Sequence, residues 1–574
     1  MAFPQLARSL IRERNWSVLV DLLVFAAILA GMYAVLATVR YWMGVATTHT
    51  HISRSPAALP VYAFYSLVRM AVAYLLSLVF AVGYGYIAAN NRRAEMVMIA
   101  VLDILQSIPV LSFLPGVMLS MVALFPTWQL GVELGSIVLI FTGQVWNMAF
   151  SFYSSLKSIP RELREAAAIN RFSAMQRFVE LELPSGTIGL VWNSIVSVAG
   201  GWFFLMVCEM FELRHHDFRL PGLGSYLQTA ASTGDTAAIV WGLTAMVTVI
   251  VLIDQLIWRP AIAWSEKFKV EQVESSAEVT SPILHLLRNS DVSRWLQKRA
   301  FEPVWERLTT SPSRETPAPV VRARHRGRVA AGAVLLALAI AVPYLLVKAA
   351  LLLKGLQSAE LAVTLEAAGA SFGRVAAALV TASLWAIPAG VAIGSNPRLA
   401  KIAQPLAQIA ASVPATALFP VVLLGLVRLG GGLGVGSIVL MLLGTQWYIL
   451  FNVIAGAMAI PTELREAASV FRFTRWQRWR TLILPGIFPY LVTGLVTASG
   501  GAWNATILAE YFHFQGKTMT TLGLGAQISS ATDSGNSELL LLSTVVMATL
   551  VVCVNRLVWR PLYRLAGSRY RLDS

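Results

Sequence analysis

The sequence predicts an all-α, polytopic membrane protein with about 12 transmembrane helices, arranged as two parallel six-helix repeats. Composition is the first observation: 56% of the 574 residues are hydrophobic and 13% are charged, against roughly 25% charged in a soluble domain. Second, apolar residues form continuous blocks, such as 22–39 and 539–554, and a helix of about 20 such residues crosses a bilayer. Third, a long internal repeat divides the chain into two similar parts.

The pattern of these blocks favours helices over a closed barrel, because apolar residues run continuously and do not alternate. A large soluble enzyme with buried helices is the alternative, and the scarcity of charge disfavours it. The formal net charge of +15 does not indicate nucleic-acid binding, since basic residues fall mostly between apolar blocks and act as topology signals. Cys208 and Cys553 show neither metal-ligand spacing nor a disulfide framework.

Six apolar blocks precede residue 260 and six follow residue 328. The third block contains Pro109 and Pro115, which predict a kinked or broken helix. The expected spans are 18–39, 62–88, 94–125, 135–156, 186–210, 236–258, 329–353, 371–395, 399–426, 433–456, 487–509 and 539–558.

Lysine and arginine positions orient these helices. Arg92 and Arg93 follow the second block, a basic cluster follows the fourth, and residues 126–134 contain neither Lys nor Arg. The second half repeats this alternation. By the positive-inside rule, both termini and the even-numbered loops face the cytoplasm, so we expect a multi-pass membrane protein.

The expected organisation is a first membrane half at 1–258, a cytoplasmic linker at 259–328 and a second membrane half at 329–574. Residues 309–319 are rich in Thr, Ser and Pro and predict a flexible or extended linker. For 283–308, an interfacial helix and a plain soluble helix both remain open.

The repeat is the most informative feature. Glu165 pairs with Glu466 at an offset of 301 residues, and the same offset pairs Gly222-Leu-Gly224 with Gly523-Leu-Gly525. Earlier residues align at 305, so that Arg69 matches Arg374. Both halves have six helices and start on the same side, which predicts a pseudo-two-fold axis along the membrane normal and one central pathway between the halves.

A short polar segment between the fourth and fifth helices recurs in both halves. Pro160 and Pro461 suit a first helical position, and Glu162 and Glu463 suit the positive end of a helix dipole. We expect a short cytoplasmic helix set in a rigid bend that ends at Leu183-Pro184 or Leu484-Pro485. An ordinary positive-inside loop would explain one copy but not two matched copies.

These segments resemble the EAA loop of binding-protein-dependent ABC importer permeases, through Glu165-Ala-Ala167 and Glu466-Ala-Ala468. The Trp–Glu spacing followed by Gly-Leu-Gly resembles the nitrate/sulfonate/taurine branch. The resemblance implies docking of each loop into a groove of a cytoplasmic ATPase. The implied coupling residues are Arg164, Glu165, Ala166, Ala167, Pro184, Arg465, Glu466, Ala467, Ala468 and Pro485. The family usually has Gly where this chain has Arg171 and Arg472, which puts the docking geometry in question.

The resemblance also implies partners: two ATP-binding subunits and an extracytoplasmic substrate-binding protein, besides membrane lipid and without nucleic acid. We expect a transport subunit, not an enzyme, with no cofactor or metal in this chain and with ATP and Mg on the partner ATPase. A P-loop at Gly516-Lys-Thr518 is excluded because Tyr511 stands where glycine is required.

Four residues are candidates for the solute pathway: Trp202, Glu209, Trp503 and Glu510. A carboxylate within the membrane normally faces a cavity or a partner. Structural pairing of each Glu and interfacial packing of each Trp are the equally weighted alternative. Arg69 and Arg374 are interpreted as snorkelling to the outer surface, with substrate contact as the second possibility.

Two other functions compete with the importer. An ion-coupled secondary transporter would also contain repeats, but it would place charged relay residues at mid-membrane and would not need paired EAA segments. A membrane scaffold without transport would not need a symmetric pathway.

Overall fold

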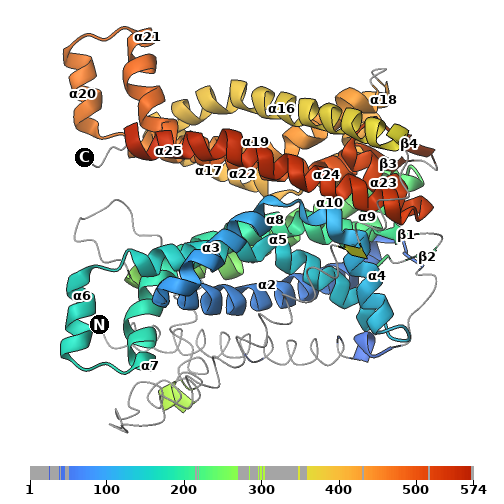
Figure 1. The fold of residues 1–574 in the computed structure, drawn as a ribbon, viewed down its shortest axis with the longest axis horizontal. Coiled ribbons are helices and arrows are strands. Elements are labelled where there is room, and N and C mark those ends of the chain that lie inside the picture. The colour runs from blue at the N-terminus through green and yellow to red at the C-terminus, as the bar shows by residue number, and fades with distance from the viewer. Residues whose placement is uncertain are drawn as a thin grey trace, which may run out of the picture.

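Figure 1 shows the fold as a computed structural model of the chain. The described residues are 40–44, 51–213, 216–217, 219–268, 358–428, 432–514 and 517–569, with a few isolated residues or pairs of residues elsewhere. The predicted helices at 18–39 and 329–353, and most of the predicted linker at 259–328, lie outside the described part of the chain.

In the first half, long helices alternate with short helical turns, and one small hairpin follows the fifth predicted span. The elements are η1 (Pro56–Ala58), α2 (Leu59–Asn90), α3 (Arg92–Ser107), η2 (Val110–Phe113), α4 (Leu114–Leu124), α5 (Leu130–Lys157), α6 (Arg161–Ile169), α7 (Ala174–Arg177), η3 (Phe178–Glu182), α8 (Leu183–Glu209), β1 (Glu212–Leu213), β2 (His216–Asp217), α9 (Leu223–Ser232), α10 (Thr236–Ile253), η4 (Asp254–Trp258), α11 (Arg259–Ser265) and η5 (Glu266–Phe268).

The second half repeats this order. Its elements are α16 (Ser358–Ser395), α17 (Pro397–Ser412), α18 (Ala415–Arg428), α19 (Leu433–Ala459), α20 (Thr462–Val470), α21 (Arg475–Arg478), η7 (Trp479–Ile483), α22 (Leu484–Ala509), β3 (Tyr511–Phe514), β4 (Lys517–Thr520), α23 (Leu524–Ser534), α24 (Ser537–Val554), η8 (Asn555–Trp559) and α25 (Arg560–Arg569).

The third helix of each half is broken, as the prolines predict. Asn91 caps α3 by accepting hydrogen bonds from the N–H groups of Arg93 and Ala94. Asn396 caps α17 in the same way. Each helix then stops before Pro109 or Pro414, because the residue before a proline is pushed into an extended conformation. The prediction of an interrupted helix is therefore confirmed.

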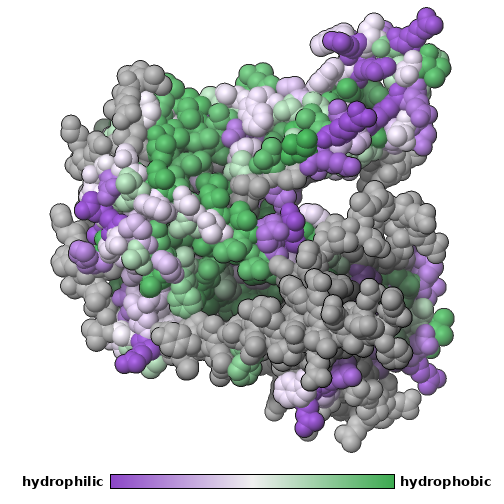
Figure 2. All heavy atoms as spheres, turned by 180° about the vertical axis from the view of Figure 1, so that it is seen from behind, coloured by the Kyte–Doolittle hydropathy of each residue, from purple (hydrophilic) through white to green (hydrophobic). Residues whose placement is uncertain are grey.

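Membrane-spanning character is plain in the described ranges, where eight helices are long and apolar enough to cross a bilayer. Side chains on their outer faces stay uncovered: Val79 is 73% exposed and Leu384 is 74% exposed. Figure 2 shows hydrophobic residues gathered across the middle of one face, with hydrophilic residues towards the two ends. Lipid is the solvent that suits such a surface. The predicted all-α polytopic fold is confirmed, with the addition of two small hairpins.

Close packing within each half depends on small residues at matched positions. A Cβ at Gly85 of α2 would meet Phe152 and the backbone of α5 at about 3 Å, and Gly390 of α16 lies equally close to Val453 of α19. Such contacts let the backbones of two membrane helices approach. The two halves lie side by side (Figure 1), with η2 against α22 and α8 against α18.

The two ends of the molecule differ. At one end, the short helices α6 and α7 project from the first half and α20 and α21 project from the second (Figure 1). At the opposite end lie the two hairpins together with α9 and α23. Because the basic loops predicted to be cytoplasmic form the projecting end, we refer to the opposite end as the outer end.

Candidate coupling surface and outer ion-pair clusters

The projecting helices begin as the sequence predicts, displaced by one residue. Pro160 and Pro461 are the residues immediately before α6 and α20, in extended conformation, and not the first helical residues. Glu162 and Glu463 lie in the first turn, as expected. A carboxylate there stabilises the helix because it faces the positive end of the helix dipole.

Both helices end in a left-handed residue that is not glycine. Arg171 has a φ of 50° and Arg472 a φ of 52°. The following residues, Phe172 and Phe473, donate backbone hydrogen bonds to the carbonyls of Ala167 and Ala468 at 3.0 Å. This is the helix ending that glycine normally occupies, since a Cβ is strained in the left-handed region. The geometry explains why glycine is the usual residue here, and shows that both arginines adopt the same turn.

The residues of the EAA segments divide into two groups. Glu165, Ala166 and Glu466 are exposed. In contrast, Ala167 is only 6% exposed and Ala468 only 4%, so their small side chains fit against this chain itself. In this conformation Ala167 and Ala468 are covered by their own chain, and their role in coupling stays a prediction.

The motif arginines also contact their own chain. Arg164 donates to the Leu156 carbonyl and Arg465 to the Ala457 carbonyl. These carbonyls lie in the last turns of α5 and α19, where carbonyl groups lack helical partners. Arg164 and Arg465 therefore hold the projecting helices against the membrane helices that precede them.

Apolar side chains project from the same surface. We define the coupling surface as the exposed residues of α6, α7, α20 and α21 and of the turns between them. Its large apolar members are Leu163, Ile169, Met175, Leu464, Val470, Phe471 and Trp476. Four of these, Ile169, Val470, Phe471 and Trp476, are 73–81% exposed. Such a patch on a polar protrusion indicates a protein-binding surface.

The polar segment gives way to the membrane helix at Leu-Pro, as expected, and the backbone stays helical through the junction. Pro184 and Pro485 lie in the first turn of α8 and α22. Each is preceded by a π-helical turn, in which Leu183 donates to the Phe178 carbonyl and Leu484 to the Trp479 carbonyl. A π-turn accommodates the hydrogen bond that proline cannot make. The expected bend is thus a wider turn within one helix, Ala174–Glu209 or Arg475–Ala509.

At the other end of α8, Glu209 lies in a closed polar cluster, the first-half cluster. Its Oε1 accepts from Ser66 Oγ at 2.6 Å and from Arg69 Nη1 at 2.9 Å, and its Oε2 accepts from Gly224 N at 2.7 Å. Arg69 also makes a two-pronged ion pair with Glu133, at 2.6 and 2.7 Å. The side chains of Arg69, Glu133 and Glu209 are at most 1% exposed. Snorkelling is therefore wrong for Arg69.

The glycines of Gly222-Leu-Gly224 are explained by the same cluster. A Cβ at Gly222 would overlap the Glu209 carboxylate, and one at Gly224 would lie 2.8 Å from the Met206 carbonyl. Gly523 and Gly525 stand in the same relation to Glu510 and Thr506. Glycine is required because the loop passes directly over the carboxylate.

The second-half cluster repeats most of these bonds around Glu510. Its Oε1 accepts from Ser371 Oγ at 2.7 Å and from Arg374 Nη1 at 2.9 Å, and its Oε2 accepts from Gly525 N at 2.9 Å. The Nη2 atom of Arg374 donates to the Thr521 hydroxyl, Oγ1, at 2.9 Å. The Arg374 side chain is 14% exposed, so it too is mostly buried.

The candidate pathway residues all lie inside the protein in this conformation. Trp202 is 2% exposed and Trp503 1%, while Glu209 and Glu510 are fully buried. Both carboxylates are paired in the two clusters. The Trp503 Nε1 atom is buried without a hydrogen-bond partner. The structure brings each glutamate to an arginine of its own half, and the two tryptophans lie on α8 and α22, which adjoin the interface between the halves.

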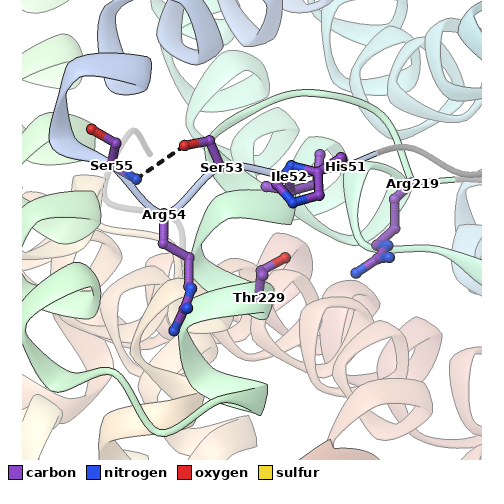
Figure 3. Close-up of a pocket in the computed structure, with 7 residues that line it drawn as sticks. All are labelled: His51, Ile52, Ser53, Arg54, Ser55, Arg219 and Thr229. Carbon is purple, nitrogen blue, oxygen red and sulfur yellow. Dashed lines mark hydrogen bonds between the residues drawn. The ribbon is translucent and has the colours of Figure 1, made fainter.

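A pocket of about 480 Å³ opens at the outer end of the first half (Figure 3). It is lined by His51, Ile52, Ser53, Arg54, Ser55, Arg219 and Thr229. Arg54 and Arg219 lie on either side of Thr229 in Figure 3. Arg54 donates to Thr233 at 3.1 Å and lies 3.6 Å from Asp235. Ala359 and Thr520 stand at the repeat positions of these arginines, so the second half does not repeat their charge.

Sequence reasoning missed Glu133, which is the main partner of Arg69. Two signals could have found it. A buried arginine within a membrane helix requires an acidic partner. In addition, the 301-residue offset pairs Glu133 with Gly434, a difference between otherwise matched helices. Among the described residues, no group of three or more His, Cys, Asp or Glu side chains could hold a metal ion.

Comparison with known proteins matches each half to the same family model. The family model "Binding-protein-dependent transport system inner membrane component" matches residues 81–257 and 386–561. Similar proteins include the nitrate import permease protein NrtB of Leptolyngbya laminosa, 27% identical over 33% of this chain and 64% of the relative. The bicarbonate transport system permease protein CmpB of Synechocystis is 31% identical over 25% and 49%. The taurine transport system permease protein TauC of Escherichia coli is 29% identical over 31% and 62%. The matches thus span about half to two thirds of these relatives.

Proposed function

Because the chain belongs to the family of binding-protein-dependent transport system inner membrane components, we propose that it is the permease subunit of an ATP-driven ABC importer. Two permease halves are fused in one polypeptide and together form the solute pathway across the bacterial inner membrane, with both termini in the cytoplasm. The double family match and the repeated helices support this proposal. An ion-coupled secondary transporter is disfavoured because the family is defined by dependence on a binding protein.

The observation that carries the proposal is the pair of matched projecting helices, α6 and α20. Each presents an exposed glutamate beside uncovered apolar side chains, and each is held to a membrane helix by its motif arginine. A partner that binds ATP would dock one subunit on each helix. ATP and Mg would then be bound by that partner, and this chain would act as the transport subunit.

Stoichiometry tests this proposal directly. Because both halves are present in one chain, the working complex should contain one copy of it and two ATPase subunits. The complex should be purified from its native membrane and weighed by native mass spectrometry. A complex with two copies of this chain, or with no ATPase, would refute the proposal.

At the outer end, the basic pocket around Arg54 and Arg219 suits an acidic side chain of a substrate-binding protein. The second half has no matching charge at those two positions. We therefore expect the binding protein to contact the two halves unequally. The transported solute is expected to be a small anion or zwitterion, as nitrate, bicarbonate and taurine are in the names of the relatives. Mass spectrometry of the ligand that copurifies with the cognate binding protein would identify it.

The pathway is expected along the interface where α8 and η2 meet α18 and α22. Trp202 and Trp503 lie near this interface, about two helical turns from Glu209 and Glu510. If alternating access opens it, cysteines introduced at positions 202 and 503 should change their reactivity when ATP is bound. Unchanged labelling in both nucleotide states would assign the tryptophans to packing.

A further inference from the structure

The two polar clusters at the outer end are built on one plan, and they differ at one contact. In both, an arginine and a serine donate to a buried glutamate, and the first turn of the following helix closes over it. The difference concerns the guanidinium edge formed by Nε and Nη2, which does not face the buried glutamate. Arg69 uses this edge to hold Glu133. In the second half, Gly434 stands at the repeat position of Glu133, so Arg374 lacks this carboxylate partner.

This replacement changes the charge of the site. The first-half cluster contains one arginine and two glutamates, so its formal charge is negative. The second-half cluster contains one arginine and one glutamate, so it is neutral. The Nη2 of Arg374 is satisfied by Thr521, a neutral hydroxyl. Thr521 stands at the repeat position of Leu220. Its hydroxyl therefore contacts the Nη2 atom that a carboxylate contacts in the first half.

Among the described residues, the position of the missing carboxylate is open. Of their atoms, a Cβ built on Gly434 would meet a single one within 4 Å, Thr521 Oγ1 at 3.8 Å, and a Cβ on Gly432 would meet none. Neighbouring Leu522 is 50% exposed, and the Arg374 side chain keeps 14% of its surface. The guanidinium edge is therefore reachable from the outer end. In the first half, Gly131 stands at the repeat position of Gly432. A Cβ there would be tightly packed against the Met121 and Phe125 carbonyls.

We propose that the Nε edge of Arg374, with the Thr521 hydroxyl, binds a small oxoanion in the place that the Glu133 carboxylate occupies in the first half. The guanidinium fork matches the planar geometry of carboxylate and of nitrate, and charge-assisted bonds of this kind are strong. The first-half cluster demonstrates that one guanidinium at this site holds two anionic groups at once. In the importer proposed above, on which this inference rests, the oxoanion would be the arriving solute.

The test uses the full-length chain in detergent, without ATPase or binding protein, and sodium nitrate as the probe. Isothermal titration should give saturable binding of one nitrate per chain. Gly434→Glu supplies the missing carboxylate and should abolish binding, while raising the thermal midpoint because Arg374 gains an ion pair. Thr521→Val should weaken binding about 10- to 100-fold, since a hydrogen bond to a charged group is lost.

Gly434→Ala is the matched control. It adds a methyl group in open space, leaves the guanidinium edge free, and should bind nitrate as the unaltered chain does. Equal binding by Gly434→Glu and the unaltered chain would overturn the proposal, and so would the absence of saturable binding to the unaltered chain. In the second case, loss of binding-protein docking in Gly434→Glu would assign the edge to a protein carboxylate instead. Copurification of the ATPase is a separate measurement, so failure of the anion site and failure of the importer assignment are distinguishable.

Discussion

The backbone N–H of Leu111 donates to the side-chain oxygen of Asn504 at 3.3 Å. Leu111 lies in η2, at the break in the third helix of the first half, and Asn504 lies on α22 of the second half. The bond therefore joins the two halves, at the point where a broken helix exposes a backbone donor. Phe203 stands at the repeat position of Asn504, so the side chain that accepts this bond is not repeated in the first half.

Asn504→Ala should destabilise the contact between the halves. A buried N–H without a partner costs about 1–3 kcal/mol, so the thermal midpoint of the purified chain should fall. Asn504→Asp keeps a hydrogen-bond acceptor, so the thermal midpoint of this variant should fall less. Asn452→Ala is the control, because Asn452 makes the same bond to a carbonyl four residues earlier, within one half. An equal loss in Asn452→Ala would show that the effect is local to the helix.

Glu209→Gln should be more damaging than Glu133→Gln. Removing one member of a buried ion pair costs about 3–5 kcal/mol, and Glu209 also accepts bonds from Ser66 and Gly224. Glu133→Gln leaves one arginine with one glutamate, the composition that the second half already has. Thermal unfolding and protein level in the membrane measure the difference. The reverse order would contradict the interpretation of the two clusters.

Arg171→Gly and Arg472→Gly should each stabilise the folded chain. A left-handed conformation costs a residue with a Cβ about 1–2 kcal/mol, and glycine adopts it freely. Arg171→Ala keeps the Cβ and is the control, which should not gain stability. The readout is the thermal midpoint of the purified chain. If alanine stabilises as much as glycine, the arginine side chain itself, and not the backbone, is the source of strain.

Replacing Glu165 and Glu466 together by Lys should abolish association with the ATPase. Both side chains are exposed, so the chain should still fold and insert. Glu180→Lys, at another exposed position beyond α7, is a control with the same charge change per replaced residue and should retain association. Copurification and ATP-dependent uptake are the measurements. Full association and uptake by the double variant would remove these glutamates from the coupling surface.

Arg54→Ala with Arg219→Ala should slow association of the binding protein. Charges at the rim of an interface act mainly on the association rate, and their effect weakens with added salt. Thr520→Ala, at the second-half position of Arg219, is the matched control. Surface plasmon resonance at two ionic strengths gives the rates. An unchanged, salt-independent association rate in the double variant would exclude the pocket from docking.

The helices and their breaks could be predicted because they follow from local rules. Long apolar runs require helices in a bilayer, and Pro109 and Pro414 interrupt the third helix of each half through their own geometry. The repeat added the pairing of Arg69 with Arg374 and of Glu209 with Glu510. These pairs proved to be members of the same kind of cluster.

The partners within each cluster could not be predicted from the repeat alone. Arg69 and Glu133 are 64 residues apart, and their contact depends on how α2 packs against α5. The repeat draws attention to what both halves share, while Glu133 is a residue that one half lacks. The burial of Ala167 and Ala468 is a similar case, because only the packing of the projecting helices decides which alanine of the motif faces the chain.

The straight membrane helix α8, from Leu183 to Glu209, has a mechanical consequence. Its 27 residues span about 40 Å, at 1.5 Å per residue. One end follows the π-helical turn that joins it to the projecting helices, and the other end carries the carboxylate that holds the loop at the outer end. A tilt of only about 7° around one end would displace the other by about 5 Å, one helical pitch. The chain thus contains two levers, α8 and α22, and a small movement at the projecting end is enough to reposition groups at the outer end.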